Sequence, residues 1–273
     1  MLFVTYIEKE LKKLEISIKD IKLKEKPLAV GGFGEVYKSK WGQQDVAVKI
    51  ITVDIRMTET DILNEAILTF RLKHENVIKL IGITHTERKN LGIVMELAEH
   101  GSLDKWIGKI KQVKMTNIAL GIVDGLEYVH SQKVIHRDIK PKNILMLGPE
   151  DDMIPKIADF GVSKVIQTAV TPKTKVGEDL YMAPEVRMFN RYSYPADVYS
   201  LAIMLFEMFN EQLIRQSSEE IQTFIMRVSN GRIGENPQSC KVPKSLHIVI
   251  KRGWDETAED RPELYEYRSV LEG

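Results

Sequence analysis

Four side chains in the middle of the chain have types and spacing suited to phosphate chemistry. Residues 135–145 read IHRDIKPKNIL, so Asp138 is followed by Lys140 and Asn143, and a second carboxylate, Asp159, comes after a turn. A carboxylate can orient a hydroxyl and accept its proton, a lysine can neutralise phosphate charge, and Asn and Asp oxygens are hard ligands suited to Mg²⁺. The set indicates transfer of a phosphoryl group to a hydroxyl.

This stretch resembles the protein-kinase catalytic loop, H-R-D-x-x-x-x-N, followed by the Asp-Phe-Gly motif at Asp159. An isolated Asp-Phe-Gly is more often a turn than a metal site, but the combination with Asp138 and Asn143 is specific. The resemblance implies an α+β, bilobal protein-kinase fold. We expect an antiparallel sheet plus one helix (αC) in an N-lobe at 19–96, and a mainly helical C-lobe at 99–271, together a kinase domain over 19–271.

The resemblance also implies a role for each residue. Asp138 would orient the substrate hydroxyl, Lys140 would neutralise the moving phosphoryl group, and Asn143 and Asp159 would hold Mg²⁺, with Mn²⁺ as the alternative ion. Lys140, two residues after Asp138, is the family's mark of Ser/Thr specificity. The leading expectation is therefore an ATP-dependent kinase that acts on Ser/Thr hydroxyls of protein substrates.

These residues need elements that hold a nucleotide, and the first is a glycine-rich loop. Gly31, Gly32 and Gly34 lie between apolar segments, where backbone N–H groups can close over phosphate oxygens, although a plain hairpin turn would look similar. The strand that follows ends on Lys49 and resembles the kinase V-A-I-K strand, whose lysine holds the α- and β-phosphates. Ala29 replaces the usual first glycine and costs about 1 kcal/mol where φ must be positive, which predicts weaker nucleotide cover.

Residues 58–72 have helical periodicity, and the resemblance implies that they supply the partner of Lys49. The resemblance places Glu65 as the αC glutamate that pairs with Lys49, whereas a glutamate in mid-helix is ordinarily only solvated. Thr69 stands where the family has an apolar residue, which predicts looser packing of this helix.

The remaining nucleotide contacts are expected around an apolar strand at 91–96. It resembles the hinge between two lobes, with Met95 as gatekeeper and the backbone of Glu96 and Ala98 bonding the adenine edge; a strand-to-helix turn is the plainer alternative. Three apolar residues complete the nucleotide-binding set: Val36, Ala47 and Leu145.

Two further helices and an ion pair are expected to hold the catalytic loop. Residues 116–131 carry an apolar stripe and lead into the loop. Asp197, at the start of an apolar helix, resembles the family residue that holds the loop backbone, and Arg261 resembles the partner of Glu185. The Trp254-Asp255 and Arg261-Pro262 pairs resemble the tyrosine-kinase-like branch of Ser/Thr kinases, and residues 162–164 resemble receptor-interacting kinases.

Residues 159–185 resemble an activation segment with three candidate phosphorylation sites, Thr168, Thr171 and Thr174. A phosphate there could be bound by Arg137, although these threonines could equally be plain loop residues.

One residue of this segment departs from the family pattern in a way that is expected to affect the rate of phosphoryl transfer. Glu178 stands where Ser/Thr kinases have a threonine, so it could pair with Lys140 and crowd Asp138 with like charge. Together with Ala29 and Thr69 it favours an alternative, a nucleotide-binding pseudokinase or scaffold with weak catalysis. The full catalytic set argues against that alternative.

The N-terminal residues 1–18 carry an amphipathic helical stripe. It predicts either a helix that caps the following domain or the end of a coiled coil through which the chain self-associates. Its apolar members recur three and four residues apart: Phe3, Ile7, Leu11, Leu14 and Ile18.

The composition limits the kinds of partner and the cellular location that the chain can have. The chain is 43% hydrophobic and 29% charged, as in globular proteins, and 39 basic residues balance 39 acidic ones, so nothing favours nucleic acid or a membrane surface. The apolar run 201–206 is too short to span a bilayer. Cys240 is the only cysteine, so we expect a reducing compartment: the cytoplasm, or the cytoplasmic portion of a larger protein.

Overall fold

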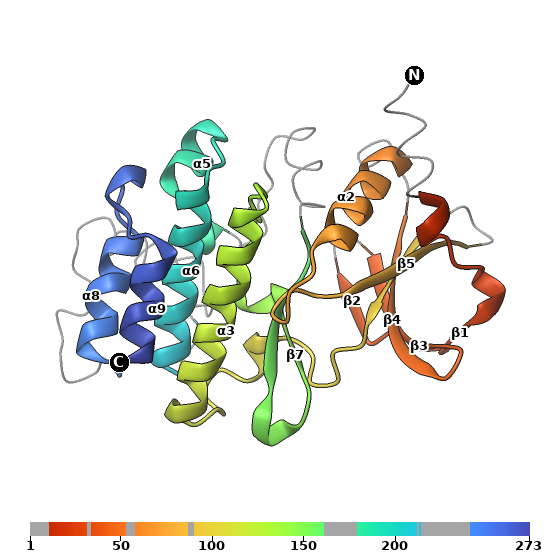
Figure 1. The fold of residues 1–273 in the computed structure, drawn as a ribbon, viewed down its shortest axis with the longest axis horizontal. Coiled ribbons are helices and arrows are strands. Elements are labelled where there is room, and N and C mark those ends of the chain that lie inside the picture. The colour runs from red at the N-terminus through yellow and green to blue at the C-terminus, as the bar shows by residue number, and fades with distance from the viewer. Residues whose placement is uncertain are drawn as a thin grey trace. The chain divides into compact units, whose positions relative to one another are not determined.

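The structure is a computed structural model, which describes residues 11–31, 34–52, 58–86, 90–160, 179–211, 213 and 241–273. The chain forms two compact units. Unit 1 comprises residues 1–99 and 160–171, and unit 2 comprises residues 100–159 and 172–273. Unit 1 holds an antiparallel sheet with one long helix and unit 2 is mainly helical, as expected (Figure 1).

Unit 1 is built on an antiparallel sheet of six strands. In sheet order these run β1-β3-β4-β6-β5, and β2 pairs with β3. The strands are β1 (Ile21–Leu23), β2 (Ala29–Gly31), β3 (Gly34–Trp41), β4 (Gln44–Ile51), β5 (Leu80–His85) and β6 (Leu91–Glu96). The long central strands alternate between two apolar faces, because successive side chains of a strand point to opposite sides.

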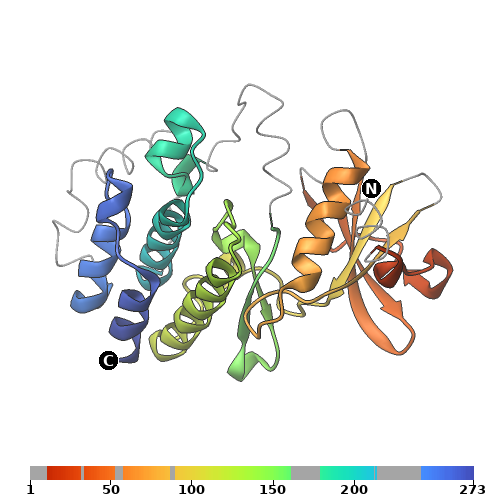
Figure 2. The same cartoon turned by 45° about the horizontal axis from the view of Figure 1, so that its top comes forward.

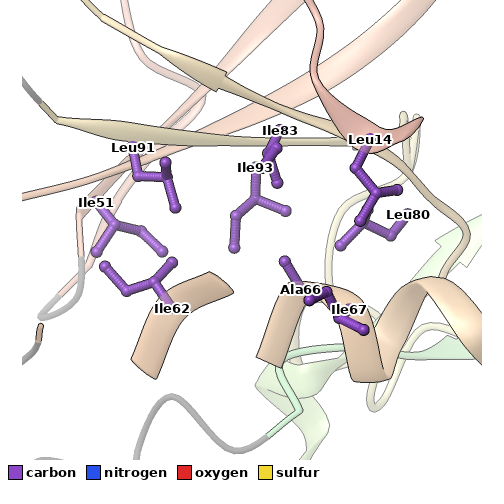
Figure 3. Packing of buried hydrophobic residues seen from close by; sticks show 9 residues of the cluster. All are labelled: Leu14, Ile51, Ile62, Ala66, Ile67, Leu80, Ile83, Leu91 and Ile93. Atoms are coloured by element: carbon purple, nitrogen blue, oxygen red, sulfur yellow. The ribbon is translucent and has the colours of Figure 1, made fainter. Parts of the chain in front are cut away.

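Helix α2 (Glu59–Arg71) packs against one face of this sheet through a cluster that we call the α2 cluster. Figure 3 shows the helix residues Ile62, Ala66 and Ile67 directed at the strands. The α2 cluster consists of Leu14, Ile51, Ile62, Ala66, Ile67, Leu80, Ile83, Leu91 and Ile93. A second cluster, the opposite-face cluster, consists of Ile16, Ile21, Val46, Val48 and Val94. Thr69 of α2 is itself buried, at 6% exposure.

The N-terminal segment differs from the helix expected over residues 1–18. In the described part the helix ends at Leu14, Glu15 forms a parallel bridge with Ile83 of β5, and Ile18–Asp20 is a 3₁₀ turn (η1). The Ile16 amide donates to the Ile83 carbonyl at 2.7 Å. The edge of β5 therefore holds the chain in extended form where the three-and-four spacing alone predicts continued helix.

Unit 2 contains five helices and a two-stranded hairpin within its described part (Figure 2). The helices are α3 (Gln112–Ser131), α5 (Pro184–Phe189), α6 (Tyr194–Phe209), α8 (Lys244–Gly253) and α9 (Leu264–Glu272); the strands are β7 (Ile144–Leu147) and β8 (Ile154–Ile157). Short 3₁₀ turns are η2 (Leu103–Lys105), η3 (Pro141–Asn143), η4 (Glu150–Asp152), η5 (Asp179–Tyr181) and η6 (Ala258–Asp260). Helix α3 begins at Gln112 rather than at residue 116, since its first turn carries the exposed Val113 and so lies off the apolar stripe.

Helix α6 forms the centre of unit 2 and is buried along most of its length. Its close packing depends on small residues. A Cβ at Gly253 of α8 would lie 2.6 Å from the Ala202 Cβ of α6 and 1.9 Å from the Tyr267 hydroxyl of α9. Ala202 is accommodated because residue 253 has no side chain. Among the helices described, none is long and apolar enough to cross a membrane.

Candidate active site

The β7–β8 hairpin brings the two predicted metal ligands of unit 2 to one end. Ile144 pairs with Ile157, and the Ala158 amide donates to the Asn143 carbonyl at 2.9 Å. Asn143 directly precedes β7 and Asp159 closely follows β8, so both lie where the hairpin opens. The carboxylate of Asp159 belongs to an exposed residue.

The Asp138 carboxylate is fixed by its two motif neighbours. Its Oδ2 lies 2.8 Å from Lys140 Nζ and accepts a hydrogen bond from Asn143 Nδ2 at 2.6 Å. Asn143 Nδ2 also donates to the Asp138 main-chain carbonyl at 2.7 Å. The Asp138 and Lys140 side chains are 23% and 12% exposed, so the charged pair is sheltered yet reachable from solvent. The three side chains predicted from the motif are therefore in direct contact.

Asp197 of α6 holds the backbone beneath this group. Its Oδ2 accepts from the His136 amide at 2.8 Å and its Oδ1 accepts from the Arg137 amide at 2.7 Å. His130 Nε2 lies 2.9 Å from the same Oδ2. Asp197 is only 1% exposed, and buried polar groups are ordinarily paired by such hydrogen bonds. The predicted role of Asp197 is confirmed, whereas His130 was missed, because nothing in its local sequence marks a contact with a residue so far along the chain.

His136 ties the catalytic loop to the end of β8. The Asp138 amide donates to His136 Nδ1 at 3.3 Å, and His136 Nε2 lies 3.0 Å from the Ala158 carbonyl. This pattern requires a neutral ring with its proton on Nε2. Burial lowers the pKa of His136, although the Asp197 carboxylate opposes part of that shift. The neutral form therefore agrees with both the hydrogen bonds and the burial.

Two residues of the site have strained backbone. Arg137 has φ 74° and Asp159 has φ 64°, in the left-handed region that non-glycine residues seldom adopt. Each such residue costs of order 1–3 kcal/mol, and such costs cluster at functional sites. The Arg137 amide is bonded to Asp197, and the Ala158 amide, next to Asp159, is bonded to the Asn143 carbonyl.

Arg137 also carries an unsatisfied donor. Its guanidinium lies over the Tyr192 ring, 5.4 Å from the ring centroid, and its Nε is buried without a hydrogen-bond partner among the described residues. Buried donors are ordinarily paired. Tyr192 was also missed from sequence, since no motif includes it.

Unit 1 gathers the predicted nucleotide-binding residues on one face of its sheet. The register pairs Val36 with Lys49, and Ala47 with Met95, and directly opposed residues share a face. Ile51 follows Lys49 on that face and belongs to the α2 cluster, so Lys49 lies on the side that α2 covers. Lys49 is 7% exposed.

The glycine loop begins from a close β2–β3 turn. Gly31 pairs with Gly34, whose φ is +136°, and a Cβ at Gly34 would lie 1.9 Å from the Ile50 carbonyl oxygen. Only glycine fits there. Gly32 lies outside the described residues.

Glu96, one of the two residues whose backbone is expected to bond adenine, makes two hydrogen bonds with Lys79. The Glu96 amide donates to the Lys79 carbonyl at 3.1 Å, and Glu96 Oε1 accepts from the Lys79 amide at 2.7 Å. The Glu96 amide is therefore already bonded within unit 1, which leaves its expected contact with adenine a prediction. Ala98 is half-buried beyond the strand, and Leu145 of β7, in unit 2, is likewise half-buried.

The predicted ion pair at the end of the activation segment is present within unit 2. Arg261 donates to both carboxylate oxygens of Glu185 at 2.7 and 2.8 Å, and also to the carbonyls of Asp255 and Pro195. The Arg261 side chain is fully buried. By contrast, Glu65 lies in α2 with its side chain outside the described part, so its pairing with Lys49 stays a prediction. Thr168, Thr171, Thr174 and Glu178 lie outside the described residues, so the roles expected for them also stay predictions.

The donor set suits a magnesium ion that is shared with phosphates. Both N–H contacts of the Asn143 amide are directed at Asp138, which leaves its carbonyl oxygen as the ligand atom. In the described part of the chain, no group of three or more His, Cys, Asp or Glu side chains could hold a metal unaided. Mg²⁺ sites in nucleotide-binding enzymes ordinarily use one or two protein ligands plus substrate phosphates.

Comparison with known proteins identifies the family. The model of the protein kinase domain matches residues 23–268. The chain belongs to the protein kinase family. The kinase STY17 of Arabidopsis thaliana, named a serine/threonine-protein kinase, is 31% identical over 94% of this chain and 45% of its own length. The PR5-like receptor kinase of the same plant is 35% identical over 90% of this chain and 41% of its own length. This kinase chain thus spans less than half the length of these relatives.

Proposed function

We propose that this kinase domain transfers the γ-phosphoryl group of ATP to Ser/Thr hydroxyls of protein substrates. The observation that carries the proposal is the Asp138 carboxylate, held between Lys140 and Asn143 on a loop fixed by Asp197. Similarity to a serine/threonine-protein kinase and the position of Lys140 support the choice of Ser/Thr. The single cysteine supports action in a reducing compartment such as the cytoplasm.

In this reaction Asp138 serves as the proton acceptor. Its Oδ2 is engaged by Lys140 and Asn143, while its Oδ1 receives no hydrogen bond from the described residues, so we assign the substrate hydroxyl to Oδ1. The hydroxyl oxygen bonds to the γ-phosphorus, the bond from that phosphorus to the bridging oxygen breaks, and the hydroxyl proton passes to Asp138. Lys140 Nζ, beside the carboxylate, neutralises charge on the moving group.

Nucleotide and metal are assigned to the other residues of the site. Lys49 and the loop of Gly31 and Gly34 would bind the phosphates in unit 1, beside the apolar face of Val36, Ala47 and Met95. The Asn143 carbonyl oxygen and Asp159 would hold Mg²⁺, which neutralises charge on the phosphate oxygens when bound.

The test is phosphate incorporation from labelled ATP·Mg into a mixed protein substrate, followed by phosphoamino-acid analysis. Asp138→Asn should cut turnover by roughly 10²–10⁴, the range for losing a general base, and leave nucleotide binding intact. Phosphoserine and phosphothreonine should be the products. Equal incorporation by both proteins would exclude the role of Asp138. Nucleotide binding without incorporation by the unmodified chain would favour the scaffold alternative, which Ala29, Thr69 and Glu178 motivate.

A further inference from the structure

The N-terminal segment 11–16 precedes the part of the chain that matches the kinase family, which starts at residue 23. It is nevertheless built into unit 1. Leu14 is 1% exposed within the α2 cluster, and Leu11 packs against the same cluster. Because Leu14 is buried, the segment is not a loose extension of the kinase domain. Its burial indicates a structural role within unit 1.

The segment is attached along the edge of β5, the terminal strand of the sheet. Glu15 bridges Ile83 in parallel register, and the Ile16 amide donates to the Ile83 carbonyl at 2.7 Å. The approach is close because residue 82 is glycine. A Cβ at Gly82 would lie 2.4 Å from the Leu14 carbonyl oxygen and 2.6 Å from Ile16 Cδ1. Glycine within a strand often marks such a close approach of another backbone.

Leu14 and Ile16 point to opposite faces of the sheet. Leu14 enters the α2 cluster, and Ile16 enters the opposite-face cluster with Val46, Val48 and Val94. Figure 3 shows Leu14 beside Leu80, on the side of the sheet from which Ala66 and Ile67 of α2 approach. Leu14 therefore belongs to the cluster that contains α2 residues, whereas Ile16 does not.

We propose that segment 11–16 is a positioning element for helix α2, and that Leu14 is its positioning residue. Leu14 occupies the cluster that Ala66 enters, and Ala66 follows Glu65 directly on the helix. Fixing this part of α2 to the β5 edge fixes Glu65 relative to the strand that carries Lys49. The inference rests on the proposed function in assigning Glu65 and Lys49 to ATP. Release of the segment from β5 lowers phosphoryl transfer by loosening α2.

The segment supplies its own matched control, because Leu14→Ala and Ile16→Ala each shorten one buried aliphatic side chain on opposite faces. Hydrogen exchange of the full chain should show α2 amides exchanging at least about tenfold faster in Leu14→Ala than in Ile16→Ala, since the cavity lies in the cluster that holds the helix. Leu14→Met, which conserves volume, should restore α2 protection. Equal α2 exchange in the two alanine variants would overturn the proposal.

Gly82→Ala tests the same idea without changing the segment. The added methyl group would meet the Leu14 carbonyl oxygen, so the segment should leave the β5 edge. We expect faster α2 exchange, as in Leu14→Ala, together with new tryptic cleavage after Lys12 or Lys13. Gly42→Ala is the control for general destabilisation of unit 1, since its φ of +60° strains an alanine while nothing lies within 4 Å of a Cβ there. If Gly82→Ala frees the segment and α2 exchange stays at the unmodified rate, the segment does not position α2.

Kinetics separates this inference from the proposed function. At equal folded fraction, kcat/KM for ATP should fall by about tenfold in Leu14→Ala and by less than about twofold in Ile16→Ala. If the unmodified chain transfers no phosphate, and α2 is loosened by Leu14→Ala but not by Ile16→Ala, the proposed function is refuted and the positioning role of Leu14 stands. An active chain in which both variants behave alike would refute the positioning role alone.

Discussion

Arg137 is the residue whose surroundings most directly indicate a missing partner. Its Nε is buried and unpaired among the described residues, and its backbone is held at φ 74° by the Asp197 contact. An anion that reaches this guanidinium would satisfy the donor. A phosphothreonine adds about −1.5 to −2 charges and three strong acceptor oxygens. We therefore propose that one of Thr168, Thr171 and Thr174 carries the phosphate.

Phosphatase treatment of the protein, after incubation with ATP, should lower its activity. A charge-assisted hydrogen bond contributes about 1.5–3 kcal/mol, so a loss of about tenfold or more is expected. Arg137→Ala should be less active and should no longer respond to phosphatase. The triple-alanine variant of the three threonines should behave likewise, and mass spectrometry should locate the phosphate. Full activity of that variant would contradict the assignment.

His136 makes stability depend on pH near neutrality. Burial lowers its pKa, so in acid the unfolded chain takes up a proton that the folded site does not. The unfolded state then binds more protons, and stability rises with pH below the ordinary His value of about 6.5. From pH 6.5 to 5.5, urea unfolding should show a loss approaching about 1.4 kcal/mol per pH unit from this one group.

A second histidine provides the control for this slope. Burial also lowers the pKa of His247, with a smaller part from Lys251, and His247 is less buried than His136. His247→Gln should therefore keep most of the slope, and His136→Gln should remove most of it while also weakening the loop. An unchanged slope in His136→Gln would show that other groups cause the pH dependence.

At the scale of elements, the β2–β3 turn and the β3–β4 turn both contain a glycine with positive φ. Gly34 has φ +136° with the Ile50 carbonyl 1.9 Å from a Cβ position, whereas Gly42 has φ +60° with open space around it. Gly34→Ala should distort the loop that we propose to bind the phosphates and raise KM for ATP by about tenfold or more. Gly42→Ala should cost about 1–2 kcal/mol of stability and leave KM unchanged. Equal KM values in both variants would show that the turn does not serve the nucleotide.

How far sequence predicts each element depends on how local its determinants are. The β6 strand and the α3 stripe follow from short-range periodicity, whereas the Glu185–Arg261 pair, 76 residues apart, follows from the family resemblance; all three were confirmed. The predicted end of the N-terminal helix was wrong, because Leu14 and Ile18 fit a helical stripe, whereas the β5 edge, distant in sequence, holds residues 15 and 16 in extended form. His130 and Tyr192 could not be predicted, since only the folded chain brings them to Asp197 and Arg137.

At the scale of the whole molecule, each compact unit has its own core. The α2 cluster and the opposite-face cluster stabilise unit 1, while unit 2 is centred on α6 with thirteen buried residues. Proteins open in cooperative parts that follow such cores. A substitution confined to one unit should therefore change protection mainly within that unit.

Arg261→Met tests this independence from the side of unit 2. Removing one partner of the buried Glu185 pair should cost about 3–5 kcal/mol. We expect faster exchange of the α6 and α8 amides, with amides of β4 and β6 unchanged. Arg252→Met is the matched control: Arg252 pairs with Glu266 at the surface of the same unit, where an ion pair contributes about 0–1 kcal/mol. If Arg261→Met accelerated exchange equally in α6 and β4, the two cores would unfold as one cooperative structure, and destabilising unit 2 would then also release the strand that carries Lys49.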